Sequence, residues 1–231
     1  MFKRIVVFLL SMLLIIPVAS ADTNKEIVFH GIPWGTSVDE LVDQLRERNI
    51  PSGSIYDNYD MRYWGSQFLS ITEDHFDSTG YMISIYDYDD KIKIAGHPVL
   101  NINLYAHYGM VDDKISLDAD DSNYHFCTIM FAAGDEMVVG VYNDLLVKLN
   151  TLYGSSTEST FKVGSSKYTA STWYGANNTA VNLYRYISDD QKYQSVNLCY
   201  GKTDGEQTLR EVRRLVIEHE LQSVADDSTG L

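Results

Sequence analysis

Tyrosine is the residue type that gathers most clearly in this sequence. Of 17 tyrosines, Tyr56, Tyr59 and Tyr63 lie close together beside Trp64, in a stretch from Ser52 to Gly80 that lacks periodicity. A tyrosine ring has a flat apolar face and a polar tip, and few rotatable bonds are fixed when it binds. We therefore predict these four as ligand-binding residues on a long surface loop. Strand-rich proteins also use tyrosine to cover their sheets, which is the alternative explanation.

Metal-binding patterns are incomplete in the sequence. The six histidines are scattered and none forms the His-Glu-x-x-His pattern of a zinc protease helix. Two acidic groups carry the oxygen ligands that calcium prefers: Glu73, Asp74, His75 and Asp77, and Asp118, Asp120 and Asp121. Both groups lack the glycine and the final glutamate of a calcium loop. We predict no metal site and no cofactor.

Nucleophilic catalysis has no local signature either. No serine lies in a Gly-x-Ser-x-Gly turn, and neither cysteine has the surroundings typical of a thiol protease. We therefore predict no catalytic residue. Paired carboxylates need only meet in the folded chain, so a hydrolase acting on glycans or peptides stays open as the alternative.

The two cysteines raise the question of a disulfide. Cys127 shares a face of its expected strand with Ile129, whereas Leu198 and Tyr200 turn Cys199 away from the core. An oxidising compartment would allow the two thiols to pair. The sequence leaves both pairing and free thiols open.

The N-terminus has the three parts of a secretory signal. Lys3 and Arg4 precede an apolar run from 5 to 16, and small residues end at Ala21. The run is shorter than the roughly 20 residues that a membrane anchor needs. We expect residues 1–21 to be cleaved and the protein to be secreted, with no membrane span afterwards.

The charge restricts the partners. The chain carries 32 acidic residues against 18 Lys and Arg, a formal net charge of −14, and loss of the leader makes it more acidic. Such a chain is repelled by phosphate backbones, so we expect no nucleic-acid partner. An unidentified protein or glycan remains as the expected partner.

Hydrophobic periodicity predicts three helices among short strands. The helices are expected near 37–48, 137–153 and 204–221, with Ser37 as an N-cap and Gly154 as a stop. Alternating residues predict strands at 27–29, 81–86, 91–94, 99–107, 114–117, 124–132, 161–163, 167–174, 179–186 and 194–200, and a further one near 68–71.

This order predicts an α+β fold. We expect an antiparallel sheet of about seven strands with three helices packed mainly on one face. Residues 22–221 would form a single domain and 222–231 a flexible tail. The competing organisation is two half-domains, each a helix followed by a meander, divided near Gly154.

Three features carry a family resemblance. The opening Phe29-His30-Gly31-Ile32-Pro33-Trp34-Gly35-Thr36-Ser37, the segment 145–154 ending in Leu-Tyr-Gly, and Trp173 resemble uncharacterised exported proteins of Gram-positive gut bacteria. That resemblance implies export and fold without implying an activity. In layout alone the chain is also similar to β-lactamase inhibitor proteins, which implies protein binding.

These observations favour a secreted, non-catalytic binding module. The secreted hydrolase is the alternative, and a purely structural component of the cell envelope is a third.

Overall fold

A computed structural model describes residues 25–51, 53–59, 80–87, 92–134, 137–163, 166–188, 190 and 193–228. The expected leader, Tyr63, Trp64, the acidic group 73–77 and the expected strand near 68–71 lie outside these residues.

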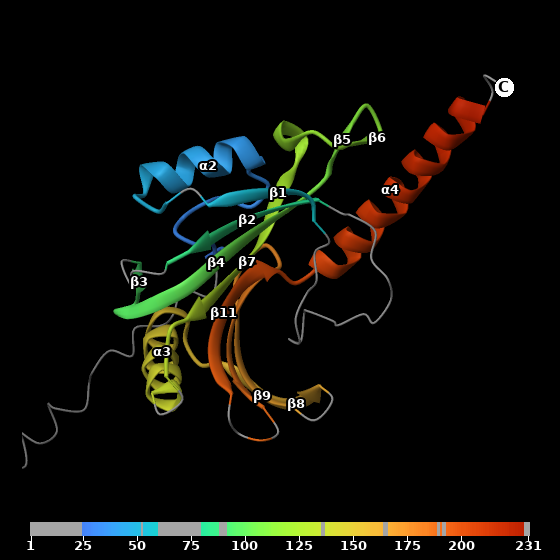
Figure 1. Ribbon diagram of the computed structural model, residues 1–231. Helices are drawn as coiled ribbons and strands as arrows, with labels where there is room; N and C mark the ends of the chain where they lie inside the picture. Colours follow the sequence, from blue (N-terminus) through green and yellow to red (C-terminus); the bar gives the residue numbers. More distant parts are fainter. Residues whose placement is uncertain are drawn as a thin grey trace, which may run out of the picture.

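The fold is α+β, as predicted, and its centre is a nine-stranded antiparallel sheet, larger than expected (Figure 1). The sheet order is β1-β2-β4-β7-β11-β10-β9-β8, with β3 paired to β4, and β5 and β6 form a separate hairpin. The bounds are β1 Ser54–Tyr59, β2 Gly80–Tyr86, β3 Lys93–Ile94, β4 His97–His107, β5 Gly109–Val111, β6 Lys114–Ser116, β7 Asn123–Phe131, β8 Thr157–Val163, β9 Ser166–Tyr174, β10 Thr179–Ile187 and β11 Gln194–Lys202. The helices are α2 Val38–Glu47, α3 Val138–Tyr153 and α4 Gly205–Ser228.

The chain uses one arrangement twice. Helix α2 precedes the four strands β1, β2, β4 and β7, and helix α3 precedes β8, β9, β10 and β11. Within each unit the strands lie in sequence order, and the two units meet where their last strands, β7 and β11, pair antiparallel. The two helix-plus-meander units therefore share one continuous sheet.

Strand alternation divides the side chains of the sheet between two faces. On one, which we call the helix face, Leu104, Ile129 and Leu198 belong to the main core together with apolar residues of α2 and α3. The opposite face carries a smaller buried cluster, made of Tyr105, Phe126, Ala170, Ala180, Tyr184 and Cys199. Strands β8 to β11 bend away from α3, toward this opposite face (Figure 1).

Helices α2 and α3 follow the sequence closely. The Ser37 hydroxyl caps α2 by accepting a hydrogen bond from the Glu40 N–H at 3.4 Å, and Leu41 and Leu45 are fully buried. Helix α3 ends before Gly154, whose φ of 84° suits glycine. Both helices lie on the helix face, as predicted.

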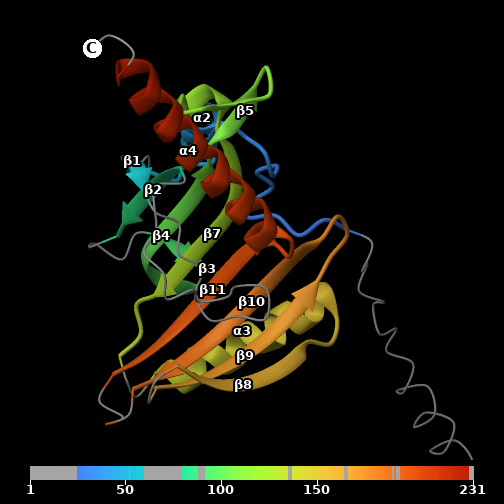
Figure 2. The same ribbon diagram turned by 90° about the vertical axis from the view of Figure 1, so that its right-hand side faces the viewer.

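Helix α4 lies on the other side of the sheet, in front of it in Figure 2 while α2 and α3 lie behind. Two of the three helices therefore share one face, as expected for packing mainly on one face, and α4 is the exception. At the end of β11 the helix face is already occupied, because Phe29 packs against Tyr200 with ring centroids 5.8 Å apart. The helix also continues to Ser228, whereas the sequence analysis expected it to end at Leu221. No glycine or proline lies between Leu221 and Gly230 to end it earlier.

The segment before α2 is not the strand expected at residues 27–29. Its only ladder contact in the described chain is an isolated bridge from Glu26 to Ala176. Ile27 and Phe29 are nevertheless buried, and the Trp34 indole N–H donates to the Ile27 carbonyl at 3.0 Å. The apolar alternation here reflects burial in an irregular segment rather than strand pairing.

No helix in the described part of the chain is long and apolar enough to cross a membrane.

Trp173 on β9 joins the end of α3 to the sheet by packing and two hydrogen bonds. The ring is 1 % exposed, and its N–H donates to the Gly154 carbonyl at 2.9 Å and to Asn150 Oδ1 at 3.1 Å. Trp173→Phe leaves both acceptors without this donor and removes buried volume, so we expect a loss of about 2 kcal/mol in urea unfolding. The neighbouring exposed Tyr174→Phe should change stability by less than about 0.5 kcal/mol. Equal effects of the two variants would contradict this role of Trp173.

Candidate functional site

Four aromatic rings form a row across the opposite face of the sheet. We call Phe161, Tyr168, Tyr186 and Tyr193 the aromatic row. Neighbouring centroids lie 5.1 Å apart between Phe161 and Tyr168, 5.1 Å between Tyr168 and Tyr186, and 5.8 Å between Tyr186 and Tyr193. The row therefore crosses β8, β9, β10 and the turn into β11.

Strand register and one hairpin bring these rings together. Phe161 is paired with Tyr168, and Tyr168 with Tyr186, so the three rings point to the same face. The turn after β10 adds the fourth ring, because the Ser188 N–H donates to the Tyr193 carbonyl at 2.9 Å and the Tyr193 N–H donates to the Ser188 hydroxyl at 3.0 Å. Phe161 also packs against the small buried cluster of this face.

The aromatic row is accessible enough to contact a ligand. Tyr193 is 56 % exposed, and the other three rings are half-buried. Among the described elements no helix lies over this part of the face, since α2 and α3 are on the helix face and α4 contacts β6 (Figure 2). Burial, and then the neighbouring Tyr186, raise the pKa of Tyr168, so its hydroxyl stays neutral at physiological pH and can donate a hydrogen bond.

The predicted tyrosine loop begins with a strand instead. Tyr56 and Tyr59 lie on β1, in register with Met82 and Gly80, so the loop expectation is wrong for these two residues. Strand β1 is one edge of the sheet and β8 is the other, so the backbone of these residues is far from the aromatic row in the strand order. Tyr63 and Trp64 lie outside the described residues, and their part in binding stays a prediction.

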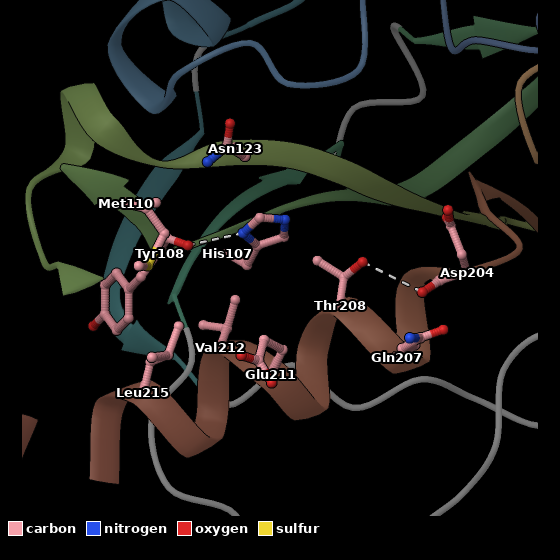
Figure 3. A pocket seen from close by; sticks show the side chains of 11 residues that line it. His107, Tyr108, Met110, Asn123, Asp204, Gln207, Thr208, Glu211, Val212 and Leu215 are labelled. Carbon is pink, nitrogen blue, oxygen red and sulfur yellow. Dashed lines mark hydrogen bonds between the residues drawn. The ribbon is translucent and has the colours of Figure 1, made fainter. Parts of the chain in front are cut away.

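A cavity of about 660 Å³ lies between α4 and the ends of β4 and β7 (Figure 3). Its wall includes His107 and Asn123 from the sheet and Gln207, Thr208 and Val212 from α4. Sequence patterns did not indicate this cavity, because it forms only where α4 packs across the sheet.

One member of a histidine pair, His107, lines this cavity. The rings of His107 and His125 have centroids 4.7 Å apart. Nδ1 of His107 lies 2.9 Å from the Tyr108 carbonyl, which can only accept, so Nδ1 carries the hydrogen (Figure 3). Burial lowers the pKa of His107, and burial followed by the charge of His107 lowers the pKa of His125 well below the ordinary value. Both rings are therefore neutral near pH 7.

The carboxylates of this cavity are already partnered. Glu211 Oε1 accepts from Arg214 Nη2 at 2.6 Å, and this bond lowers the pKa of Glu211. Asp204 Oδ2 accepts from Asn178 Nδ2 at 3.4 Å. An ion-paired carboxylate of lowered pKa is a poor proton donor at neutral pH.

A second histidine contact lies on the helix side of the sheet. His97 Nε2 is 2.6 Å from Asp144 Oδ2, and Lys148 Nζ donates to the same oxygen at 2.5 Å. Lys148 also donates to the Ala95 carbonyl at 2.7 Å. The bonds from Lys148 and then His97 lower the pKa of Asp144. This group fastens the β3–β4 turn to α3.

The cysteines are free and lie on opposite faces of adjacent strands. Cys127 is paired with Tyr200, and Cys199 with Thr128, so the two sulfur atoms point away from each other. This geometry answers the disulfide question left open by the sequence: the thiols do not pair. Burial raises the pKa of both thiols above the ordinary value.

Of the acidic residues before β7, Asp120 faces another carboxylate and Asp121 is bound to a serine hydroxyl. Asp120 is hydrogen-bonded to Asp39 at the start of α2, and this bond, followed by the charge of Asp39, raises the pKa of Asp120. The Asp121 carboxylate accepts from the Ser116 hydroxyl at 2.5 Å. Within the described residues no group of three or more His, Cys, Asp or Glu side chains could hold a metal ion.

Comparisons with known proteins found no matching family model, no matching curated protein and no matching solved structure.

The thiol geometry gives a direct prediction. A thiol-specific chromogenic reagent should leave Cys127 and Cys199 unreacted in the folded protein, because both are buried. In guanidinium without reductant it should label both. Labelling that requires reductant would show a disulfide and contradict the placement of the two cysteines.

The Asp39–Asp120 contact predicts a pH-dependent gain in stability. Asp120→Asn removes a negative charge beside Asp39, so the variant should resist urea better than the wild type at pH 7. The pKa of Asp120 is raised in the folded protein above its ordinary value of 3.8. Above this raised pKa, Asp120 is ionised and its repulsion with Asp39 destabilises the fold. Below 3.8, Asp120 is protonated in both the folded and the unfolded chain, so the repulsion no longer affects stability. The gain should therefore vanish near pH 3, and an unchanged gain there would refute the electrostatic cause.

Proposed function

We propose that the protein is an exported, non-catalytic binding module that holds a glycan or protein partner against the aromatic row. The observation that carries this proposal is the position of Phe161, Tyr168, Tyr186 and Tyr193 on a face that no described helix covers at that point. Aromatic rings with hydroxyl tips contribute both contact area and hydrogen bonds, which an extended neutral ligand can use.

The negative charge of the chain restricts the classes of ligand that it can bind. With a formal net charge of −14, the protein repels polyanions at long range. Uncharged polysaccharides and neutral or basic protein segments are therefore the favoured ligands.

Export is supported by the sequence of residues 1–21 and fits the thiol geometry. In an oxidising compartment a free cysteine on the protein surface would be oxidised. Cys127 and Cys199 are both buried and face away from each other, so neither is available for a disulfide with another chain. Free thiols in this fold are thus compatible with secretion.

The secreted hydrolase remains the second candidate, and the cavity beside α4 is where it would act. A general acid there would need a carboxyl group whose pKa is raised, as in glycoside hydrolases. Glu211 instead has a lowered pKa because it is paired with Arg214. This favours binding over hydrolysis. If the protein releases reducing ends from a glycan or peptides from a protein, and His107→Ala abolishes this release, hydrolysis would be favoured over binding.

Ligand binding can be tested with paired variants. The protein recovered after export should be retained on some members of a panel of insoluble neutral polysaccharides, or should cross-link to proteins of the producing culture. The double variant Tyr168→Ala/Tyr193→Ala should weaken this binding by about tenfold or more, since two ring contacts are lost.

The matched control is Tyr86→Ala, an exposed tyrosine of β2 at the far side of the sheet. It should bind like the wild type. If the control and the double variant lose binding equally, or if the double variant binds normally, the aromatic row is not the contact surface.

A further inference from the structure

Strand β8 is an edge of the sheet formed by the described strands. It pairs only with β9 among the described elements, and its register is unbroken from Thr157 to Val163 (Figure 2). The other edge, β1, has a register shift between Tyr56 and Tyr59. Natural edge strands are blunted by proline, bulges, very short length or charged side chains, and of these features β8 has only the charges of Glu158 and Lys162. No described strand pairs with its outer backbone groups, which leaves them for a strand whose charges complement those of β8.

The charges of β8 are arranged symmetrically about its centre. Glu158 and Lys162 lie two positions on either side of Thr160, and all three side chains are exposed on the helix side of the strand. The ladder neighbour of Lys162 on β9 is Lys167, and like charges placed opposite each other are unfavourable. The ladder neighbour of Glu158 is Ser171, which is uncharged. Each charge of β8 thus lacks an opposite charge across the β8–β9 ladder.

We propose that β8 pairs antiparallel with β8 of a second copy of this chain, with Thr160 on the two-fold axis. In this register Glu158 lies directly opposite the partner's Lys162, and Lys162 lies opposite the partner's Glu158. Two cross-strand ion pairs form. In each of them the Glu158 carboxylate of one copy lies beside Lys162 of the other copy, which is itself next to Lys167. In such a two-fold symmetric interface the same strand is used by both copies, so one sequence with Glu158 and Lys162 supplies both ion pairs.

The same pairing extends the aromatic row. On the opposite face Phe161 lies across from the partner's Ser159, and the two Phe161 rings become diagonal neighbours at about 7–8 Å. The two aromatic rows then meet end to end at the axis. A long ligand can span both copies, which raises the effective affinity without any new contact within either copy.

A second copy fits this edge better than an unrelated extended peptide. A peptide could satisfy the backbone groups, but it would match the charges only if it carried a base opposite Glu158 and an acid opposite Lys162. Strand β8 itself has this spacing. Pairing with a peptide is therefore the competing outcome of the test.

The test is charge reversal followed by mixing. Purified wild-type protein should form a dimer in sedimentation experiments over a concentration series. Glu158→Lys makes all four facing residues basic, and Lys162→Glu makes all four acidic, so each variant should weaken the dimer by about tenfold or more. Mixing the two variants should restore dimers, now heterodimers, and the doubly reversed chain should dimerise like the wild type.

The controls separate the interface from folding and from ligand binding. Lys114→Glu reverses an exposed charge on β6 and should leave the dimer unchanged. Urea midpoints of the single variants should stay near the wild-type value, because both side chains are exposed. Sedimentation needs no ligand, so its outcome is independent of the proposed binding function.

A wild-type protein that stays monomeric at all concentrations would overturn the proposal, and so would a dimer that both reversals leave intact. A mixture of the two variants that stays monomeric would also overturn it.

Discussion

The pairing of β7 with β11 is the contact on which the rest of the architecture depends. Each of these strands is the last of its own meander, and the two are far apart in sequence. Their ladder aligns Ile129 with Leu198 and Cys127 with Tyr200, so the apolar sides of both meanders point to the same face. A shift of one residue would turn one meander over and expose its apolar residues to water. The central register therefore determines which face α2 and α3 can cover.

Because both helices occupy one face, the opposite face is left to polar and aromatic side chains. Two hydrogen bonds join interior polar groups of this face: the Ser84 hydroxyl donates to Asn103 Oδ1 at 2.6 Å, and the Thr172 hydroxyl donates to Asn182 Oδ1 at 2.5 Å. Cross-strand hydrogen bonds of this kind offset the cost of burying polar groups. The aromatic row lies at the outer strands of the same face. A rigid sheet with rings fixed by register is a scaffold that gives up little entropy when a ligand binds.

Local chemistry made much of this fold predictable. Ser37 caps α2 and Gly154 stops α3, and the alternation around Cys127 and Cys199 correctly placed the thiols on different faces. Alternation alone could not separate a buried irregular segment from a strand, so residues 27–29 were assigned wrongly. The aromatic row was missed because its four members are spread over β8, β9, β10 and a turn, and only the strand order brings them together. The side of the sheet taken by α4 also depends on which face other segments already fill.

The outer half of α4 has a consequence for local motion. Among the described side chains of this helix Val216 is the last buried one, and those from Ile217 to Ser223 are exposed. The helix runs on to Ser228, roughly 18 Å beyond Val216 at 1.5 Å per residue. A helical segment of this length whose described side chains are all exposed is only marginally stable by itself, and the Arg214–Glu218 ion pair supports only its first turn. Its turns will open one after another from the C-terminus, so amide hydrogen exchange should quicken steadily along the arm while the sheet stays protected.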